Sequence, residues 1–182
     1  MNRKMAVCLI ACGFLAVAGY AQMPETPKPG PEHELLKQDV GAWDATVEIF
    51  EPGKPPAVSK GSETTTLVGG FWAVSDFKST LMGQPFEGRG TVGYDINKKK
   101  YVSTWVDSMS TTGFMTGEAT YDAKTKTMNG WMEGYDPAQG KSVKIRETTE
   151  WKDADTKVFT MFVTGADGKE VPNMKITYKR RK

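Results

Sequence analysis

The stretch Trp43-Asp-Ala-Thr-Val-Glu-Ile49 alternates apolar and polar side chains along its whole length. An alternation with period two is typical of a β-strand that buries one face and exposes the other. Further runs of the same kind follow over residues 59–67, 71–79, 87–94, 101–109, 113–121, 127–135, 142–152, 157–164 and 171–179. Together with the first stretch they predict about ten strands.

Short, turn-rich connections join these runs. Three of them begin with a Tyr-Asp pair, at Tyr94-Asp95, Tyr121-Asp122 and Tyr135-Asp136. Aspartate favours tight turns because its carboxylate accepts hydrogen bonds from nearby backbone N–H groups, so we expect these aspartates to cap turns. The alternative, a series of metal ligands, lacks the dense spacing of oxygen ligands in a calcium loop.

The runs do not alternate with helical segments, which excludes a parallel α/β sheet. Strands joined by hairpins form a sandwich or a barrel, and closing the barrel removes exposed edge strands. We therefore predict an all-β fold, a single antiparallel up-and-down β-barrel of about ten strands with one short N-terminal helix. The barrel domain is expected to span residues 32–182.

The segment before the first strand divides into a helix and a tether. Leu35, Leu36 and Val40 are spaced as on one face of a short helix, which Gly41 would end. Residues 22–31 hold four prolines and predict an extended tether with little capacity to pack.

Residues 1–21 have the features of a cleaved signal peptide. Arg3 and Lys4 precede an apolar run over residues 5–18, and Ala21 ends a small-residue exit. The run is shorter than the ~20 apolar residues of a spanning helix, so we expect an exported protein, periplasmic or secreted, with no transmembrane helix in the mature chain. Two alternatives stay open: an uncleaved membrane anchor, and a lipoprotein acylated on Cys12 within Leu9-Ile-Ala-Cys12.

The charge balance gives no reason to expect a nucleic-acid partner. The chain has 24 Lys and Arg against 22 Asp and Glu, and Arg3 and Lys4 account for the excess. The mature chain then has zero net charge, so its charge is no evidence for a basic surface that binds phosphates. The basic tail over residues 179–182 is expected to be a solvated end, with contact to a phosphate or an anionic lipid as the alternative. The composition leaves the oligomeric state open.

Residue usage also excludes several kinds of catalytic and metal site. Cys8 and Cys12 both lie in the predicted leader, and His33 is the single histidine. We therefore expect no metal site of His/Cys type, no cofactor and no cysteine nucleophile, and we assign no catalytic residue. His33 is expected to be exposed or to cap a turn. Gly88-Arg-Gly90 lies within a strand pattern, where glycines indicate a bend or a bulge rather than a phosphate-binding loop.

Several motifs carry a family resemblance: Pro29-Gly-Pro-Glu-His33, Gly41-Ala-Trp43, Gly69-Gly-Phe-Trp72, Pro85-Phe-Glu-Gly-Arg-Gly90, Gly93-Tyr-Asp95 and Ser103-Thr-Trp-Val-Asp107. With Ile176-Thr-Tyr178 near the end, they resemble a bacterial family known as domain of unknown function 1579, over about residues 29–180. The resemblance implies a secreted or periplasmic protein with a lipocalin-like barrel, and it implies no activity.

A looser likeness connects the two ends of the chain. A short helix, then Gly41-x-Trp43, then Arg180 in the last strand is similar to the lipocalin arrangement. That arrangement implies that Trp43 packs at the closed end of the barrel under Arg180 in a cation–π contact. Haem-binding barrels of similar build use a late histidine, and none follows His33, so haem binding is not carried over.

Polar and aromatic side chains on the predicted strands are the candidates for a ligand site. One face of the run over residues 101–109 carries Tyr101, Ser103, Trp105 and Asp107. Buried charges require partners, and methionine suits adaptable apolar pockets. The candidate ligand-binding residues are Trp72, Asp76, Arg89, Trp105, Asp107, Met115, Arg146 and Met161.

Three functions are compatible with these candidates. The first is a barrel that binds a small apolar or amphipathic molecule, with Asp107 or Arg146 as its polar anchor and with Asp76 and Arg89 helping to balance the charges of the cavity. The second is an enzyme that uses a carboxylate pair such as Asp76 and Asp107 for acid–base chemistry. The third is an interaction protein of the cell envelope. Alternation alone does not decide which strand face points inward. The competing interpretation is that the charged candidate residues face solvent and that the aromatic residues belong to an ordinary core.

Overall fold

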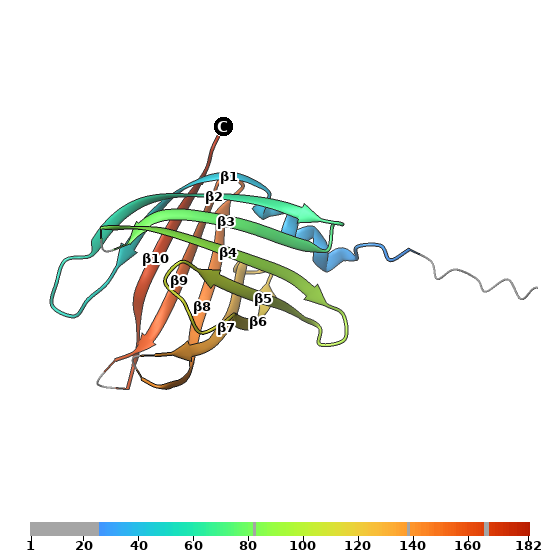
Figure 1. Cartoon of the computed structure of the whole chain (residues 1–182). Helices are drawn as coiled ribbons and strands as arrows, with labels where there is room; N and C mark the ends of the chain where they lie inside the picture. Colours follow the sequence, from blue (N-terminus) through green and yellow to red (C-terminus); the bar gives the residue numbers. More distant parts are fainter. Residues whose placement is uncertain (1–25, 82, 138, 166–167) are drawn as a thin grey trace, which may run out of the picture.

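Ten antiparallel strands form a closed barrel in the computed structural model, which describes residues 26–81, 83–137, 139–165 and 168–182 (Figure 1). Each strand pairs with its neighbours in sequence, and β1 pairs with β10 to complete the ring. The strands are β1 (Gly41–Ile49), β2 (Ala57–Val68), β3 (Trp72–Leu81), β4 (Gln84–Asp95), β5 (Lys100–Asp107), β6 (Met115–Asp122), β7 (Thr127–Asp136), β8 (Lys141–Asp153), β9 (Thr156–Thr164) and β10 (Glu170–Arg180). The predicted fold is confirmed, up-and-down order included.

In the part of the chain that the structure describes, one short helix precedes the barrel. It is the 3₁₀ helix η1 (Pro31–Asp39), and it contains Leu35 and Leu36 of the predicted short helix, while Val40 follows its end. Residues 26–30 before it form neither helix nor strand. The predicted signal peptide, residues 1–21, and the first part of the predicted tether lie outside the described residues.

The hairpins divide the barrel into two ends. The end that carries η1, the β2–β3, β4–β5, β6–β7 and β8–β9 connections and the last residues of β10 is called the closed end here; the opposite end is the open end. The helix contacts β2, β3 and β4, and Leu36 is 1% exposed in a cluster with Ala73, Tyr101 and Trp151. The Tyr101 hydroxyl also donates a hydrogen bond to the Glu32 carbonyl (2.8 Å). The helix therefore plugs the closed end.

His33 belongs to this plug. Its Nδ1 accepts a hydrogen bond from the Gly30 backbone N–H (3.0 Å), and its ring contacts Phe71 edge to face. It caps the start of η1, as predicted, but it is buried rather than exposed. Its side chain is thus occupied in holding the helix.

The aspartates of the Tyr-Asp pairs cap turns, as predicted. Asp95 Oδ1 accepts a hydrogen bond from the Asn97 N–H (2.8 Å), and Asp122 Oδ1 accepts one from the Lys124 N–H (2.8 Å). Asp136 Oδ1 accepts a hydrogen bond from the Gln139 N–H (3.3 Å). Within the described part of the chain, no helix has the length and apolarity needed to cross a membrane.

Candidate binding cavity

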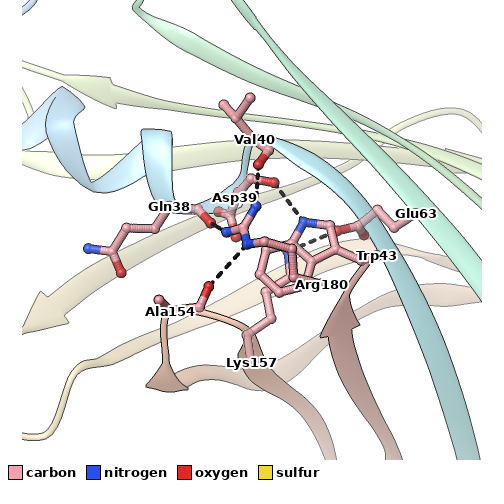
Figure 2. A network of polar contacts seen from close by, with 8 residues as sticks. All are labelled: Gln38, Asp39, Val40, Trp43, Glu63, Ala154, Lys157 and Arg180. Atoms are coloured by element: carbon pink, nitrogen blue, oxygen red, sulfur yellow. Dashed lines mark hydrogen bonds and ion pairs between the residues drawn. The ribbon is translucent and has the colours of Figure 1, made fainter. Parts of the chain in front are cut away.

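Arg180 and Trp43 lock the closed end of the barrel (Figure 2). The guanidinium lies 4.0 Å from the centre of the fully buried Trp43 indole, and it donates hydrogen bonds to the carbonyls of Val40 (2.6 Å) and Gln38 (2.7 Å). Arg180 Nε also donates to the Ala154 carbonyl (3.1 Å). The cation–π contact implied by the lipocalin likeness is therefore present, and it ties β10 to the end of η1 and to the β8–β9 turn.

A buried ion triad lies below this lock. Lys157 on β9 is 6% exposed, and its Nζ donates to Asp39 Oδ1 and to Glu63 Oε1, each at 2.8 Å. The same ammonium lies 4.9 Å from the Trp43 ring and 4.8 Å from the Tyr178 ring. One lysine thus joins η1, β1, β2, β9 and β10 at the base of the barrel interior.

The pKa values of Lys157 and of the neighbouring Tyr178 hydroxyl reflect the two carboxylates beside them. Burial acts to lower the pKa of Lys157, but the charges and hydrogen bonds of Asp39 and Glu63 act more strongly and raise it. Burial, and then the nearby Glu63 carboxylate, raise the pKa of the Tyr178 hydroxyl well above its ordinary value. Lys157 is therefore charged at neutral pH and satisfied by the two carboxylates.

Above the triad the barrel encloses a cavity of about 450 Å³. It reaches from Trp151 and Lys157 at the closed end to Leu81 and Met109 beside the open end. Its wall is mainly apolar, and the aromatic and methionine side chains include Phe77, Trp105, Met115, Met132, Phe159 and Met161. The inner faces of the strands thus form a lined chamber with a plugged base.

Trp105 lies flat against the wall because β4 gives it two glycines. A Cβ on Gly88 would lie 2.1 Å from the Trp105 ring, and a Cβ on Gly90 would lie 3.2 Å from it. The indole Nε1 donates to Asp107 Oδ2 (2.9 Å), while Asp107 Oδ1 accepts the Met109 N–H (2.9 Å). The glycines therefore make room for a side chain, where the sequence predicts a bend or a bulge.

Glu147 is an acidic group in this wall for which the structure gives no partner. Its position on β8 faces Gly130 of β7 and Met161 of β9 in the strand register, and it lines the cavity. No hydrogen bond or ion pair of its carboxyl group is formed with the described residues, and burial raises its pKa to about 7. A carboxyl group thus stands among apolar side chains inside the barrel.

Two further polar groups of the wall lack partners. The Thr65 hydroxyl and the Trp151 indole Nε1 are buried without a hydrogen bond, and both residues line the cavity. Buried polar groups in native proteins are satisfied by protein, water or ligand. Both atoms are shielded from the cavity by their neighbours, so they are not contact points for a molecule inside it.

Comparison with known proteins gives the family. The model of the family described as protein of unknown function (DUF1579) matches residues 28–180, which is most of the chain. The chain belongs to the DUF1579 family. The resemblance predicted from the sequence motifs is thus confirmed. A search of curated proteins finds no match to this sequence.

Two solved structures share the fold of this DUF1579 protein. The crystal structure of Rv2717c from M. tuberculosis aligns with a TM-score of 0.61 and 11% identity, over 85% of this chain and 100% of the other. The S-type phycobiliprotein lyase CPES from Guillardia theta aligns with a TM-score of 0.58 and 13% identity, over 83% of this chain and 93% of the other. At such low identity the likeness concerns the fold alone.

Four of the candidate residues predicted from the sequence lie on the cavity wall of the DUF1579 barrel. They are Trp105, Asp107, Met115 and Met161. Trp105 and Met115 face each other across β5 and β6, while Met161 adjoins Glu147 on the far side. The structure brings these four to one chamber, and their role in binding stays a prediction.

The other four candidates lie on the outer face. Asp76 and Arg89 pair with each other (2.6 Å) with side chains 51% and 63% exposed. Arg146 pairs with Glu170 and covers the Phe162 ring, and Trp72 is 43% exposed. A cavity in which Asp76, Arg89, Arg146 and Asp107 neutralise one another is therefore wrong, because the barrel wall separates the first three from Asp107.

The same geometry bears on the two other predicted functions. Asp76 and Asp107 lie on opposite faces of the wall, so they do not form the carboxylate pair that the enzyme hypothesis requires. The basic tail is only partly a solvated end: Arg180 belongs to the closed-end lock, and Arg181 pairs with Asp44. Across the described ranges no group of three or more His, Cys, Asp or Glu residues is placed to hold a metal ion.

Proposed function

We propose that this protein binds a small amphipathic molecule inside its barrel. The cavity carries the proposal, because about 450 Å³ falls within the roughly 300–1,000 Å³ of ligand pockets. The methionine and aromatic side chains of its wall suit the apolar part of a ligand, because methionine side chains adapt to different shapes. The unpartnered carboxyl group of Glu147 in the same wall suits a polar end.

A matched pair of tryptophan variants tests this proposal. Trp105→Ala is expected to weaken binding of the neutral dye N-phenyl-1-naphthylamine about tenfold, equivalent to about 1.4 kcal/mol, because the ring forms part of the cavity wall. Trp72→Ala removes the same side chain from the outer face and is expected to leave binding unchanged. Dye fluorescence titration gives both affinities, with circular dichroism to verify folding. Absence of saturable binding in the wild type would contradict the proposed function.

We also propose that the protein is exported and processed. The support is the basic start, the apolar run and the Ala21 exit of residues 1–21. Denaturing mass spectrometry of protein recovered from expressing cells is expected to give a mass that starts at Gln22. An acylated mass that starts at Cys12 would favour the lipoprotein alternative instead, and a full-length mass would contradict cleavage.

A further inference from the structure

The charges of the cavity wall are unevenly matched. Among the described lining residues the ionisable acids are Asp39, Glu63, Asp107 and Glu147, and the basic side chain is Lys157. Lys157 is already held by Asp39 and Glu63 at 2.8 Å each. The chamber therefore has an excess of negative charge that its own lysine does not balance.

The remaining two acids differ in how they are satisfied. Asp107 accepts hydrogen bonds from the Trp105 indole and from the Met109 backbone N–H, so both of its oxygens have donors. Glu147 has no donor among the described residues, and its register neighbours Gly130 and Met161 offer no side-chain donor. Glu147 is thus the carboxyl group of the chamber that is left for a ligand.

The strands beside Glu147 bring apolar groups next to its carboxyl group. Gly130 packs closely against β6, since a Cβ there would lie 2.6 Å from the Ala119 Cβ. The neighbouring strands present Met132 and Phe159 to the same cavity. A carboxylate in such apolar surroundings is costly without a counter-charge, and an anionic ligand would add to that cost.

From this arrangement we infer that the cavity takes an amphipathic amine, whose alkyl or aromatic body lies along the methionine wall and whose ammonium group pairs with Glu147. The inference rests on the proposed function, since it names the chemical class of the molecule held in the same chamber. An ammonium group supplies the charge and the hydrogen-bond donors that Glu147 lacks. It also keeps Glu147 ionised at neutral pH, because an adjacent cation favours the charged form of a carboxyl group.

The test compares three ligands that share a ten-carbon chain and differ in the head group: decylamine, decanol and decanoate. Each is titrated by calorimetry, and by displacement of N-phenyl-1-naphthylamine, at pH 8. The variants are Glu147→Gln, which keeps the shape and removes the charge, and Glu150→Gln, which removes one acid from the same strand where it pairs with the exposed Lys152.

Decylamine is expected to bind the wild type at least tenfold more tightly than decanol, with decanoate the weakest. Glu147→Gln should reduce the affinity for decylamine at least tenfold and remove most of its advantage over decanol, while Glu150→Gln should leave the affinities for the dye and for all three ligands unchanged. The dye and decanol could bind while decylamine binds no more tightly than decanol, or while decylamine keeps its higher affinity in Glu147→Gln. Either result would contradict an amine ligand paired with Glu147 and leave the proposed binding cavity intact. If dye and all three ligands fail to bind, the proposed function itself is overturned.

Discussion

Replacing Lys157 with methionine is expected to lower the free energy of unfolding by about 3–5 kcal/mol at pH 7. Methionine keeps most of the side-chain volume, so the loss comes from the charge. Lys157 Nζ lies 2.8 Å from the Asp39 carboxylate and 2.8 Å from the Glu63 carboxylate. Without the ammonium group, both carboxylates would remain at the base of the barrel with no counter-charge and without the hydrogen bonds that the lysine donates. Urea unfolding followed by tryptophan fluorescence measures the difference.

Two comparisons make this prediction specific to the buried triad. Lys152→Met removes a lysine that is 50% exposed and paired with Glu150, and an exposed pair of that kind contributes no more than about 1 kcal/mol. Adding Asp39→Asn and Glu63→Gln to Lys157→Met removes the unpaired charges and should recover much of the lost stability. Equal effects of Lys157→Met and Lys152→Met would show that the triad does not hold the closed end.

The strand order of this barrel could be predicted because its sequence pattern is local. Each strand runs antiparallel to the next along the chain, so short turns and period-two alternation specify nearly all of the pairing. The one long-range pairing, β1 with β10, follows from closure, and Trp43 and Arg180 meet across it. The lipocalin likeness is informative here because the contact joins the first strand to the last.

The inward face of each strand could not be predicted in the same way. Period two divides a strand into two faces but does not name the inner one, and both faces of these strands carry polar and apolar residues. On β8 the sequence predicts Arg146 as a ligand-binding residue, yet its neighbour Glu147 is the residue that faces the cavity. The outer charges find partners on adjacent strands, as Asp76 does with Arg89, which a single strand pattern does not reveal.

A signal for Glu147 nevertheless exists in the sequence. Glu147 shares its strand face with Trp151, and Lys157 shares its face with Phe159 and Met161. A charged residue in phase with large apolar neighbours is the pattern to look for, since burial of that face would carry the charge inward. The pattern does not separate the satisfied Lys157 from the unpartnered Glu147, because the partners of Lys157 lie 94 and 118 residues away.

Glu147 should make the stability of the barrel fall as the pH rises. Its pKa is about 7 in the fold and 4.5 ordinarily, so the folded state binds a proton that the unfolded chain releases. The contribution to stability is fully present below about pH 4.5 and is lost as the pH rises through about 7. At about 1.4 kcal/mol per pH unit, the loss amounts to roughly 3 kcal/mol.

The variant Glu147→Gln isolates this effect from every other titrating group. Along the strands beside Glu147, the charged group that lines the cavity is Lys157, and it is neutralised by Asp39 and Glu63. Urea unfolding at pH 4 is expected to give similar stabilities for wild type and variant, because the wild-type carboxyl group is then largely protonated in both the folded and the unfolded state. At pH 8 the variant should be more stable than the wild type by up to roughly 3 kcal/mol. A constant difference between the two proteins across this range would contradict the prediction.

The same measurement links stability to the proposed ligand. An ammonium group beside Glu147 favours its ionised form, so saturating decylamine at pH 8 should restore the stability that ionisation removes. A ligand that binds only the folded state stabilises it by mass action in any case, and decanol therefore serves as the reference for the apolar part. The excess stabilisation by decylamine over decanol should be present in the wild type and absent in Glu147→Gln, since only the wild type has the unpaired Glu147 carboxylate to neutralise.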